Sequence, residues 1–119
     1  SDDAPSVLLI QGANPAVTAN DQQLMLAGLV NEAVFTVVHD QVMTDTARYA
    51  DVVLPATTQF EVDDFAGSYG SFSLQRVNKV IDPVGESRSN DWLGRELAAR
   101  LEVQITTPRA VDIEVTQTT

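Results

Sequence analysis

The pattern of hydrophobic and polar positions predicts short strands separated by helices in the first half of the chain. Apolar runs at Val7–Ile10, Val34–Val38 and Val52–Leu54 are typical of strands buried on both faces of a parallel sheet. A helix-like patch at Thr46–Ala50, with Thr44 and Asp45 as candidate N-caps, separates the last two runs. We therefore predict an α/β fold with a Rossmann-like open, mostly parallel sheet, flanking helices and a three-layer αβα arrangement.

A further helix is predicted between the first two apolar runs. Thr18 and Asn20 are its candidate caps, and Asp21 lies in its first turn, where a negative charge is favourable. Its expected apolar stripe contains Leu24, Met25, Leu29 and Val30, and it should end near residues 31–32.

The second half of the chain has a weaker pattern. Residues 57–64 are polar and acidic, as in a loop, and Ser71–Gln75 alternates as a half-buried strand with Phe72 and Leu74 on one face. Ser89–Asp91 should begin a helix, in which Asn90 is the candidate cap. The apolar stripe of this helix contains Trp92, Leu93, Leu97, Ala98 and Leu101.

These patterns predict one principal domain at residues 7–102. Residues 1–6 are expected to be a disordered leader or a remnant left by cloning. Residues 103–119 are expected to form a C-terminal extension, with candidate strands at Val103–Thr106 and Val111–Val115.

Composition narrows the possible partners. The chain has 119 residues, 44% of them hydrophobic, which suits a modest core. Its net charge of -10 argues against a nucleic-acid partner, because such binding requires clustered Lys and Arg. No apolar run approaches the ~20 residues of a membrane span. The absence of cysteine removes disulfides and thiolate metal sites and leaves the compartment open; a cytoplasmic location is our expectation.

Polar residues follow two of the predicted strands. In open α/β sheets, ligands bind beyond the carboxyl ends of the strands, which points to Gly12–Pro15 and to the pair His39 and Asp40. The Gly12–Pro15 turn could contact a nucleotide or be an ordinary connection. Asp40 could accept hydrogen bonds from a guanine edge or a ribose, or it could cap the following helix. His39, the single histidine, is more typical of a polar edge residue than of a metal ligand.

Two further polar sites allow more than one interpretation. Glu61, Asp63 and Asp64 could perform acid–base or metal chemistry in a small hydrolase, but three acids in a polar segment are usually a solvated turn. Such a hydrolase would lack a partner nucleophile. Asn90 either caps the last helix or contacts a ligand, and its spacing favours capping.

The stretch HDQVMTDTARYADVVLPATTQFE at residues 39–61 resembles a signature of the bis-molybdopterin guanine dinucleotide oxidoreductases. This family includes formate dehydrogenases, periplasmic nitrate reductases and dimethyl sulfoxide reductase. Additional similarity lies in Gly12-x-Asn14-Pro15, in Ser68–Gly70 and in Pro83–Asn90, the last two resembling a formate-dehydrogenase-like branch. The resemblance covers roughly residues 7–101.

The resemblance implies cofactor contacts at particular residues. Asn14 matches an asparagine that contacts the dinucleotide part of the cofactor, and Asp40, next to His39, matches an aspartate that binds its guanosine end. The same motifs add Gly12, Pro15 and Thr44, and Asn90 matches an aspartate contact before the final helix. Val62 stands where some members place a lysine on the cofactor, so that charge is absent here.

The resemblance also implies a function for the chain. It is expected to hold the guanosine diphosphate arm of a molybdopterin guanine dinucleotide in a molybdenum or tungsten oxidoreductase, with formate oxidation as the first candidate reaction. No catalytic residue or metal ligand is identifiable in the chain, so we expect it to be inactive without the remaining domains of that enzyme. The alternative is a structural scaffold domain of a redox complex that has lost pterin binding.

Overall fold

A computed structural model describes residues 6–67, 69–70 and 72–105. Of the predicted leader at 1–6, residues 1–5 lie outside the described residues, as does the candidate strand Val111–Val115. The chain divides into two compact units, residues 1–56 and 57–119, which are described separately below.

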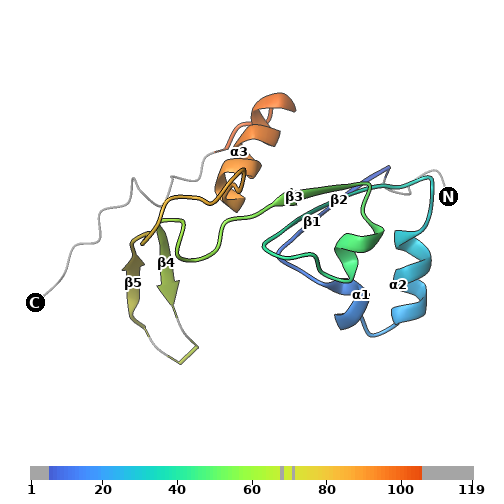
Figure 1. Ribbon diagram of the computed structural model, residues 1–119, viewed down its shortest axis with the longest axis horizontal. Coiled ribbons are helices and arrows are strands. Elements are labelled where there is room, and N and C mark those ends of the chain that lie inside the picture. Colours follow the sequence, from blue (N-terminus) through green and yellow to red (C-terminus); the bar gives the residue numbers. More distant parts are fainter. Residues whose placement is uncertain (1–5, 68, 71, 106–119) are drawn as a thin grey trace, which may run out of the picture. The chain divides into compact units, whose positions relative to one another are not determined.

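The first unit contains a parallel sheet of three strands (Figure 1). These are β1 (Val7–Gln11), β2 (Phe35–Asp40) and β3 (Val52–Pro55), arranged in the order β1-β2-β3. The predicted α/β class and the parallel sheet are therefore confirmed. His39 and Asp40, which the sequence analysis placed after a strand, are the last two residues of β2, because both are still paired with neighbouring strands.

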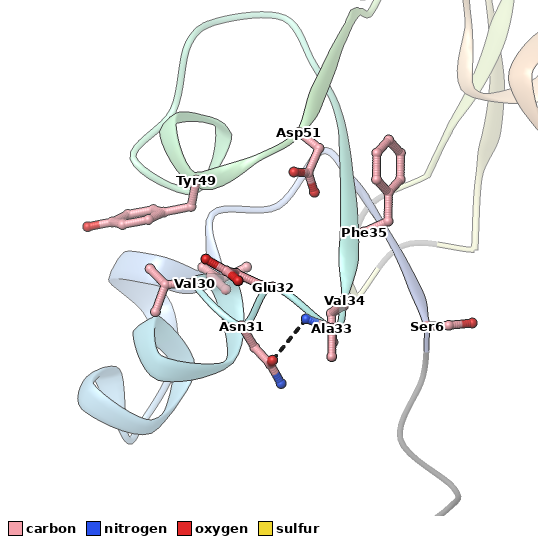
Figure 2. Close-up of a pocket in the computed structure, with 10 residues that line it drawn as sticks. Ser6, Val30, Asn31, Glu32, Ala33, Val34, Phe35, Tyr49 and Asp51 are labelled. Carbon is pink, nitrogen blue, oxygen red and sulfur yellow. Dashed lines mark hydrogen bonds between the residues drawn. The ribbon is translucent and has the colours of Figure 1, made fainter.

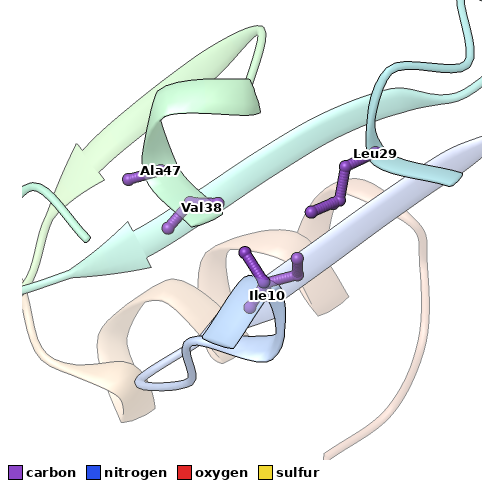
Figure 3. Packing of buried hydrophobic residues seen from close by; sticks show 5 residues of the cluster. Ile10, Leu29, Val38 and Ala47 are labelled. Carbon is purple, nitrogen blue, oxygen red and sulfur yellow. The ribbon is translucent and has the colours of Figure 1, made fainter. Parts of the chain in front are cut away.

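The helices of this unit pack on one face of the sheet (Figure 1). They are α1 (Pro15–Thr18), α2 (Gln22–Leu29) and the 3₁₀ helix η1 (Thr46–Tyr49). Their apolar side chains meet those of β1 and β2 in a core made of Ile10, Ala16, Leu29, Val38 and Ala47, most of which are drawn in Figure 3. Burial of this apolar surface is the main force that holds the helices to the sheet.

The opposite face of the sheet is more exposed than the sequence predicted. Val7 and Phe35 pair across β1 and β2, and they are 61% and 49% exposed. Val52 on β3, opposite Val37 on the same face, is also exposed. The expectation of strands buried on both faces is therefore wrong for this unit.

The helix predicted between the first two strands forms as α2, but its cap and its buried face differ from the prediction. Asp21 is the cap of α2, because its carboxylate accepts a hydrogen bond from the Leu24 amide at 3.0 Å. Thr18 belongs instead to α1, a short helix that the sequence analysis missed although Pro15 is favoured at a first helical position. In the predicted stripe, Leu24 and Val30 are exposed.

The second unit begins with an antiparallel pair of strands (Figure 1). β4 (Asp64–Gly67) pairs with β5 (Leu74–Val77). The sequence analysis did not predict β4. It also placed the following strand too early, since Phe72 is fully exposed and precedes β5. These short strands contain few β-branched residues, so their sequence signal is weak.

The second unit also contains α3 (Asn90–Arg100), close to its predicted position. Its cap is Ser89, whose hydroxyl accepts a hydrogen bond from the Trp92 amide at 3.1 Å, so the prediction that Asn90 caps the helix is wrong. Leu93 is buried, whereas Leu101 at the end of the predicted stripe is exposed. The candidate strand at 103–106 does not form over its described residues, 103–105.

Candidate functional site

The site predicted at the strand ends begins where β1 and β2 finish. The Gly12 amide donates a hydrogen bond to the His39 carbonyl at 3.0 Å, which continues the pairing of the two strands by one residue. Gly12 then turns the chain with a φ of 54°, a left-handed conformation in which glycine is the least strained residue. The loop after β1 is thereby held beside the end of β2.

Asn14 links this loop to η1. Its Oδ1 accepts hydrogen bonds from the Thr46 amide at 3.1 Å and from the Thr46 hydroxyl at 2.7 Å. The same hydroxyl accepts a hydrogen bond from the Ala16 amide at 3.0 Å. Two segments about 30 residues apart in sequence are thus joined by side-chain hydrogen bonds at the edge of the sheet.

Asp40 ends β2 and is half-buried. Its Oδ1 accepts a hydrogen bond from the neighbouring Gln41 amide at 2.7 Å, and its carbonyl accepts one from the Ala56 amide at 3.0 Å. The carboxylate does not cap η1, because the Thr44 hydroxyl accepts the Ala47 amide hydrogen there. The Asp40 carboxylate therefore lies where the carboxyl ends of the strands meet, and one of its oxygens accepts a hydrogen bond from the neighbouring residue.

The other predicted residues of this region have mixed environments. The side chain of His39 is buried, with 1% exposure, and its carbonyl accepts the hydrogen bond from the Gly12 amide. Pro15 is the first residue of α1, and Thr44 is engaged with η1 through its hydroxyl. All six predicted residues of the first unit thus lie at the end of β2, on the loops that follow β1 and β2, or, for Pro15, at the start of α1. Asn90 is an exposed residue of the second unit.

Thr46 is a polar residue of this region that the sequence analysis did not choose. It belongs to the Thr44-x-Thr46-Ala47 motif, but only Thr44 was selected from it. In the structure Thr46 is fully buried, and its hydroxyl connects Asn14 with Ala16. The sequence signal that could have identified Thr46 was its position after a candidate cap in a polar segment. Spacing alone did not reveal its contact with Asn14.

Glu61 has a structural environment in the second unit. Its side chain is buried, and its oxygens accept hydrogen bonds from the Thr58 amide at 2.7 Å, the Val84 amide at 2.6 Å and the Ser87 hydroxyl at 3.3 Å. Hydrogen bonds from Thr58, followed by that from the Val84 amide, lower the pKa of Glu61 to about 2. The interpretation of this residue as part of a solvated turn is wrong.

The remaining acids near Glu61 do not assemble a metal site. Asp63 accepts a hydrogen bond from the Lys79 amide at 3.0 Å, while Asp64 opens β4. Across the part of the chain that the structure describes, no group of three or more histidine, cysteine or acidic side chains is arranged to hold a metal ion. The geometry gives the hydrolase hypothesis no support.

A cavity of about 300 Å³ lies at the other end of the sheet (Figure 2). Phe35, the first residue of β2, and Asp51, just before β3, are among the residues that line it, together with Tyr49 and Glu32. None of the predicted site residues lines this cavity. The candidate site is therefore separate from this cavity.

Comparisons with known proteins agree on one protein family. Residues 1–100 match the family model described as molybdopterin oxidoreductase. The chain is 50% identical over 91 residues to the probable oxidoreductase YoaE of Bacillus subtilis (strain 168), covering 76% of this chain and 13% of that protein. It is 37% identical over 92 residues to the dimethyl sulfoxide/trimethylamine N-oxide reductase of Rhodobacter capsulatus, covering 76% and 11%.

A solved structure agrees with these sequence matches. Acetylene hydratase from Pelobacter acetylenicus is similar with a TM-score of 0.73 at 29% identity, covering 82% of this chain and 14% of that one. The chain thus spans only 11–14% of the length of these relatives. None of the described helices is long and apolar enough to cross a membrane.

Proposed function

We propose a binding role for this chain, which belongs to the molybdopterin oxidoreductase family. The chain would be the lobe of a larger oxidoreductase that holds the guanosine diphosphate arm of a molybdopterin guanine dinucleotide. The observation that carries this proposal is the gathering of Gly12, Asn14 and Asp40 at the carboxyl ends of β1 and β2. Open α/β sheets bind nucleotides at such an edge.

The side chains at this edge fit the chemistry of a guanosine diphosphate. A carboxylate such as Asp40 can accept the two N–H groups on the edge of guanine. The side-chain amide of Asn14 has a free donor, since its Nδ2 has no hydrogen-bond acceptor among the described residues, and phosphate oxygens are acceptors. Apart from Gly12 itself and its two chain neighbours, no heavy atom lies within 4 Å of the position that a Cβ on Gly12 would occupy, so a ligand could approach the backbone there.

The proposed division of work places binding in this lobe and redox chemistry elsewhere. When bound, the pterin and its molybdenum or tungsten would supply the two-electron chemistry. This chain would orient the dinucleotide arm through Asn14 and Asp40, with Gly12, Pro15, His39 and Thr44 shaping the loops around it. The remaining domains of the parent enzyme would provide the metal ligand and the substrate site.

The substrate of the parent enzyme is a separate part of the proposal. The Pro83–Asn90 motif favours formate oxidation, whereas the similarity to a reductase of dimethyl sulfoxide and trimethylamine N-oxide favours a reductive reaction. Both are two-electron reactions of a family cofactor, so they share the nucleotide-binding role proposed here.

A scaffold role is the second candidate. The hydrogen bonds among Asn14, Thr46 and Ala16 form without a ligand, so these residues could be retained for the fold alone. Replacement of the family lysine by Val62 also favours this role. The two candidates differ in one measurable property, which is affinity for a guanine nucleotide.

Titration of the folded chain with GDP, followed by NMR chemical shifts, tests the proposal. We expect shifts at residues 12–15 and 39–46, and we expect GDP to bind more tightly than ADP because Asp40 recognises guanine. Asp40→Asn retains an acceptor for the Gln41 amide but removes the charge. It should weaken GDP binding roughly tenfold and remove the preference over ADP.

The matched control is Asp45→Asn, which removes the same charge from an exposed residue without a side-chain cap hydrogen bond. It should leave the affinity for GDP nearly unchanged. If the folded chain shows no shifts at millimolar GDP, nucleotide binding by this lobe is contradicted and the scaffold role is favoured. If both variants weaken binding equally, the effect is one of general charge and Asp40 has no special role.

A further inference from the structure

We propose that Thr46 is a positioning residue for the nucleotide-binding loop, which it serves by fixing the orientation of the Asn14 side chain. This inference rests on the proposed function. Thr46 is fully buried in η1, and the hydrogen bonds of its hydroxyl join it to Asn14 and Ala16. It would therefore act on a ligand through Asn14 rather than by direct contact.

The hydrogen bonds around Thr46 have only one consistent direction. The Ala16 amide can only donate, so the Thr46 hydroxyl accepts there and has its single proton available for Asn14, at 2.7 Å. The Thr46 amide, at 3.1 Å from the same atom of Asn14, is also an obligatory donor. The Thr46 amide requires an acceptor, so the Asn14 atom that faces it is the oxygen of the carboxamide, which then also accepts the hydroxyl proton.

This arrangement determines what Asn14 can offer to a ligand. A flipped carboxamide would place its NH₂ group against the Thr46 amide, which can only donate, and this is unfavourable for partly buried groups. With Oδ1 held by Thr46, the group left for a ligand is Nδ2, a hydrogen-bond donor suited to a diphosphate oxygen. Fixing this rotamer before binding reduces the entropy lost when the ligand arrives.

Thr44 provides a natural contrast two positions earlier. Its hydroxyl accepts a hydrogen bond from the Ala47 amide at 3.1 Å and so supports η1, the same helix that contains Thr46. Loss of the Thr44 hydroxyl removes one hydrogen bond from this segment but none from Asn14. A purely structural role of these hydroxyls predicts similar effects at the two positions, whereas a positioning role predicts an effect on Asn14 at Thr46 alone.

The experiment compares Thr46→Val, Thr46→Ser and Thr44→Val in the full chain, with two readouts. The first is the NMR signal pair of the Asn14 side-chain NH₂, measured without ligand. The second is the affinity for GDP. We expect Thr46→Val to shift and broaden the Asn14 signals and to weaken GDP binding about fivefold, the size expected from one hydrogen bond. Thr46→Ser should restore both, and Thr44→Val should leave the Asn14 NH₂ signals unchanged, because the Thr44 hydroxyl accepts its hydrogen bond from the Ala47 amide.

A double variant separates positioning from general damage to the fold. In an Asn14→Ala background, Thr46→Val should cause no further loss of GDP affinity, because there is no carboxamide left to orient. Asn14→Asp is a second probe: it preserves an acceptor for both donors of Thr46 but has no NH₂ group. It should fold and lose affinity for GDP.

Three results would overturn the inference. They are unchanged Asn14 NH₂ signals in Thr46→Val, an undiminished further loss of GDP affinity in the Asn14→Ala background, and wild-type GDP affinity in Asn14→Asp. The ligand-free signals also separate this inference from the proposed function. If the wild-type chain binds no GDP, the proposed nucleotide function fails, while a Thr46-dependent change in the Asn14 signals would still establish that Thr46 orients this side chain.

Discussion

The two units of this chain are stabilised in different ways. In the first unit, five apolar side chains from the sheet and its helices form a continuous buried core. In the described part of the second unit, Leu93 is the one buried hydrophobic residue. The backbone amides of Thr58 and Val84 instead donate hydrogen bonds to the buried carboxylate of Glu61. The first unit therefore depends on removing apolar surface from water, and the second on charge-assisted hydrogen bonds.

This difference explains how the units should respond to perturbation. An apolar core is sensitive to the loss of volume but is indifferent to protonation. A carboxylate that accepts several hydrogen bonds is sensitive to pH, because its protonated form is a poorer acceptor. The site proposed to bind a nucleotide lies in the unit with the apolar core, where the strand ends are held in a fixed register.

Removal of core volume should give the largest effect. Leu29 on α2 is 4% exposed, so Leu29→Ala should lower the free energy of unfolding of the first unit by about 2–5 kcal/mol. The measurement is urea denaturation followed by NMR signals assigned to each unit. Leu24→Ala is the matched control, since Leu24 lies on the same helix and is 70% exposed.

The control should change the stability by no more than about 0.5 kcal/mol, as is usual for surface substitutions. Equal effects of Leu29→Ala and Leu24→Ala would contradict the assignment of the core. A loss spread equally over the signals of both units would show that the two regions unfold together rather than as separately stabilised parts.

The next effect concerns acid. The pKa of Glu61 is lowered from 4.5 to about 2 by its hydrogen bonds, so this residue stabilises the folded second unit fully above pH 4.5. As the pH falls below 4.5 the unfolded form begins to bind a proton first, and the contribution disappears as the pH passes through about 2. We expect the second unit to lose amide protection at Thr58 and Val84 over this range in hydrogen-exchange experiments.

Glu61→Gln tests whether this acid response has the proposed origin. The amide side chain cannot titrate, so the part of the response due to Glu61 should vanish, and protection at Thr58 and Val84 should already be reduced at neutral pH. Glu86→Gln, at an exposed position nearby, should behave like the unaltered chain. An acid response that persists unchanged in Glu61→Gln would have to come from other carboxylates.

The same contrast explains which features could be predicted from the sequence. The strands of the first unit were found because runs such as that at Val34–Val38 carry a strong apolar signal, and the resemblance placed Asn14 and Asp40 at their ends. Exposure of Val7 and Phe35 was not predictable, because an apolar run does not say which of its two faces is covered within the same unit.

The second unit was harder to predict because polar contacts between distant residues leave no periodic pattern. Glu61 contacts residues 84 and 87 through side-chain hydrogen bonds that span more than 20 positions, and the acidic segment around it looks like a surface turn. The contact between Asn14 and Thr46 was missed for the same reason. Spacing identifies helix faces and strand faces, but it does not identify partners of buried polar groups.

The smallest expected effect concerns the N-terminal caps of one helix in each unit. Asp21 caps α2 in the first unit and Ser89 caps α3 in the second, each accepting one amide hydrogen bond at 3.0–3.1 Å. Replacing either residue by alanine should cost about 1 kcal/mol. The loss at Asp21 should be confined to NMR signals of the first unit, and the loss at Ser89 to those of the second.

The size of these two losses sharpens the contrast between the units. The core residue Leu29 anchors α2, and Leu93 is the one buried apolar residue of α3, so fraying of the first turn should extend further along α3. Hydrogen exchange along each helix would measure this extent. Loss of protection limited to the first turn of α3 in Ser89→Ala would show that Leu93 alone anchors this helix as firmly as the apolar core anchors α2.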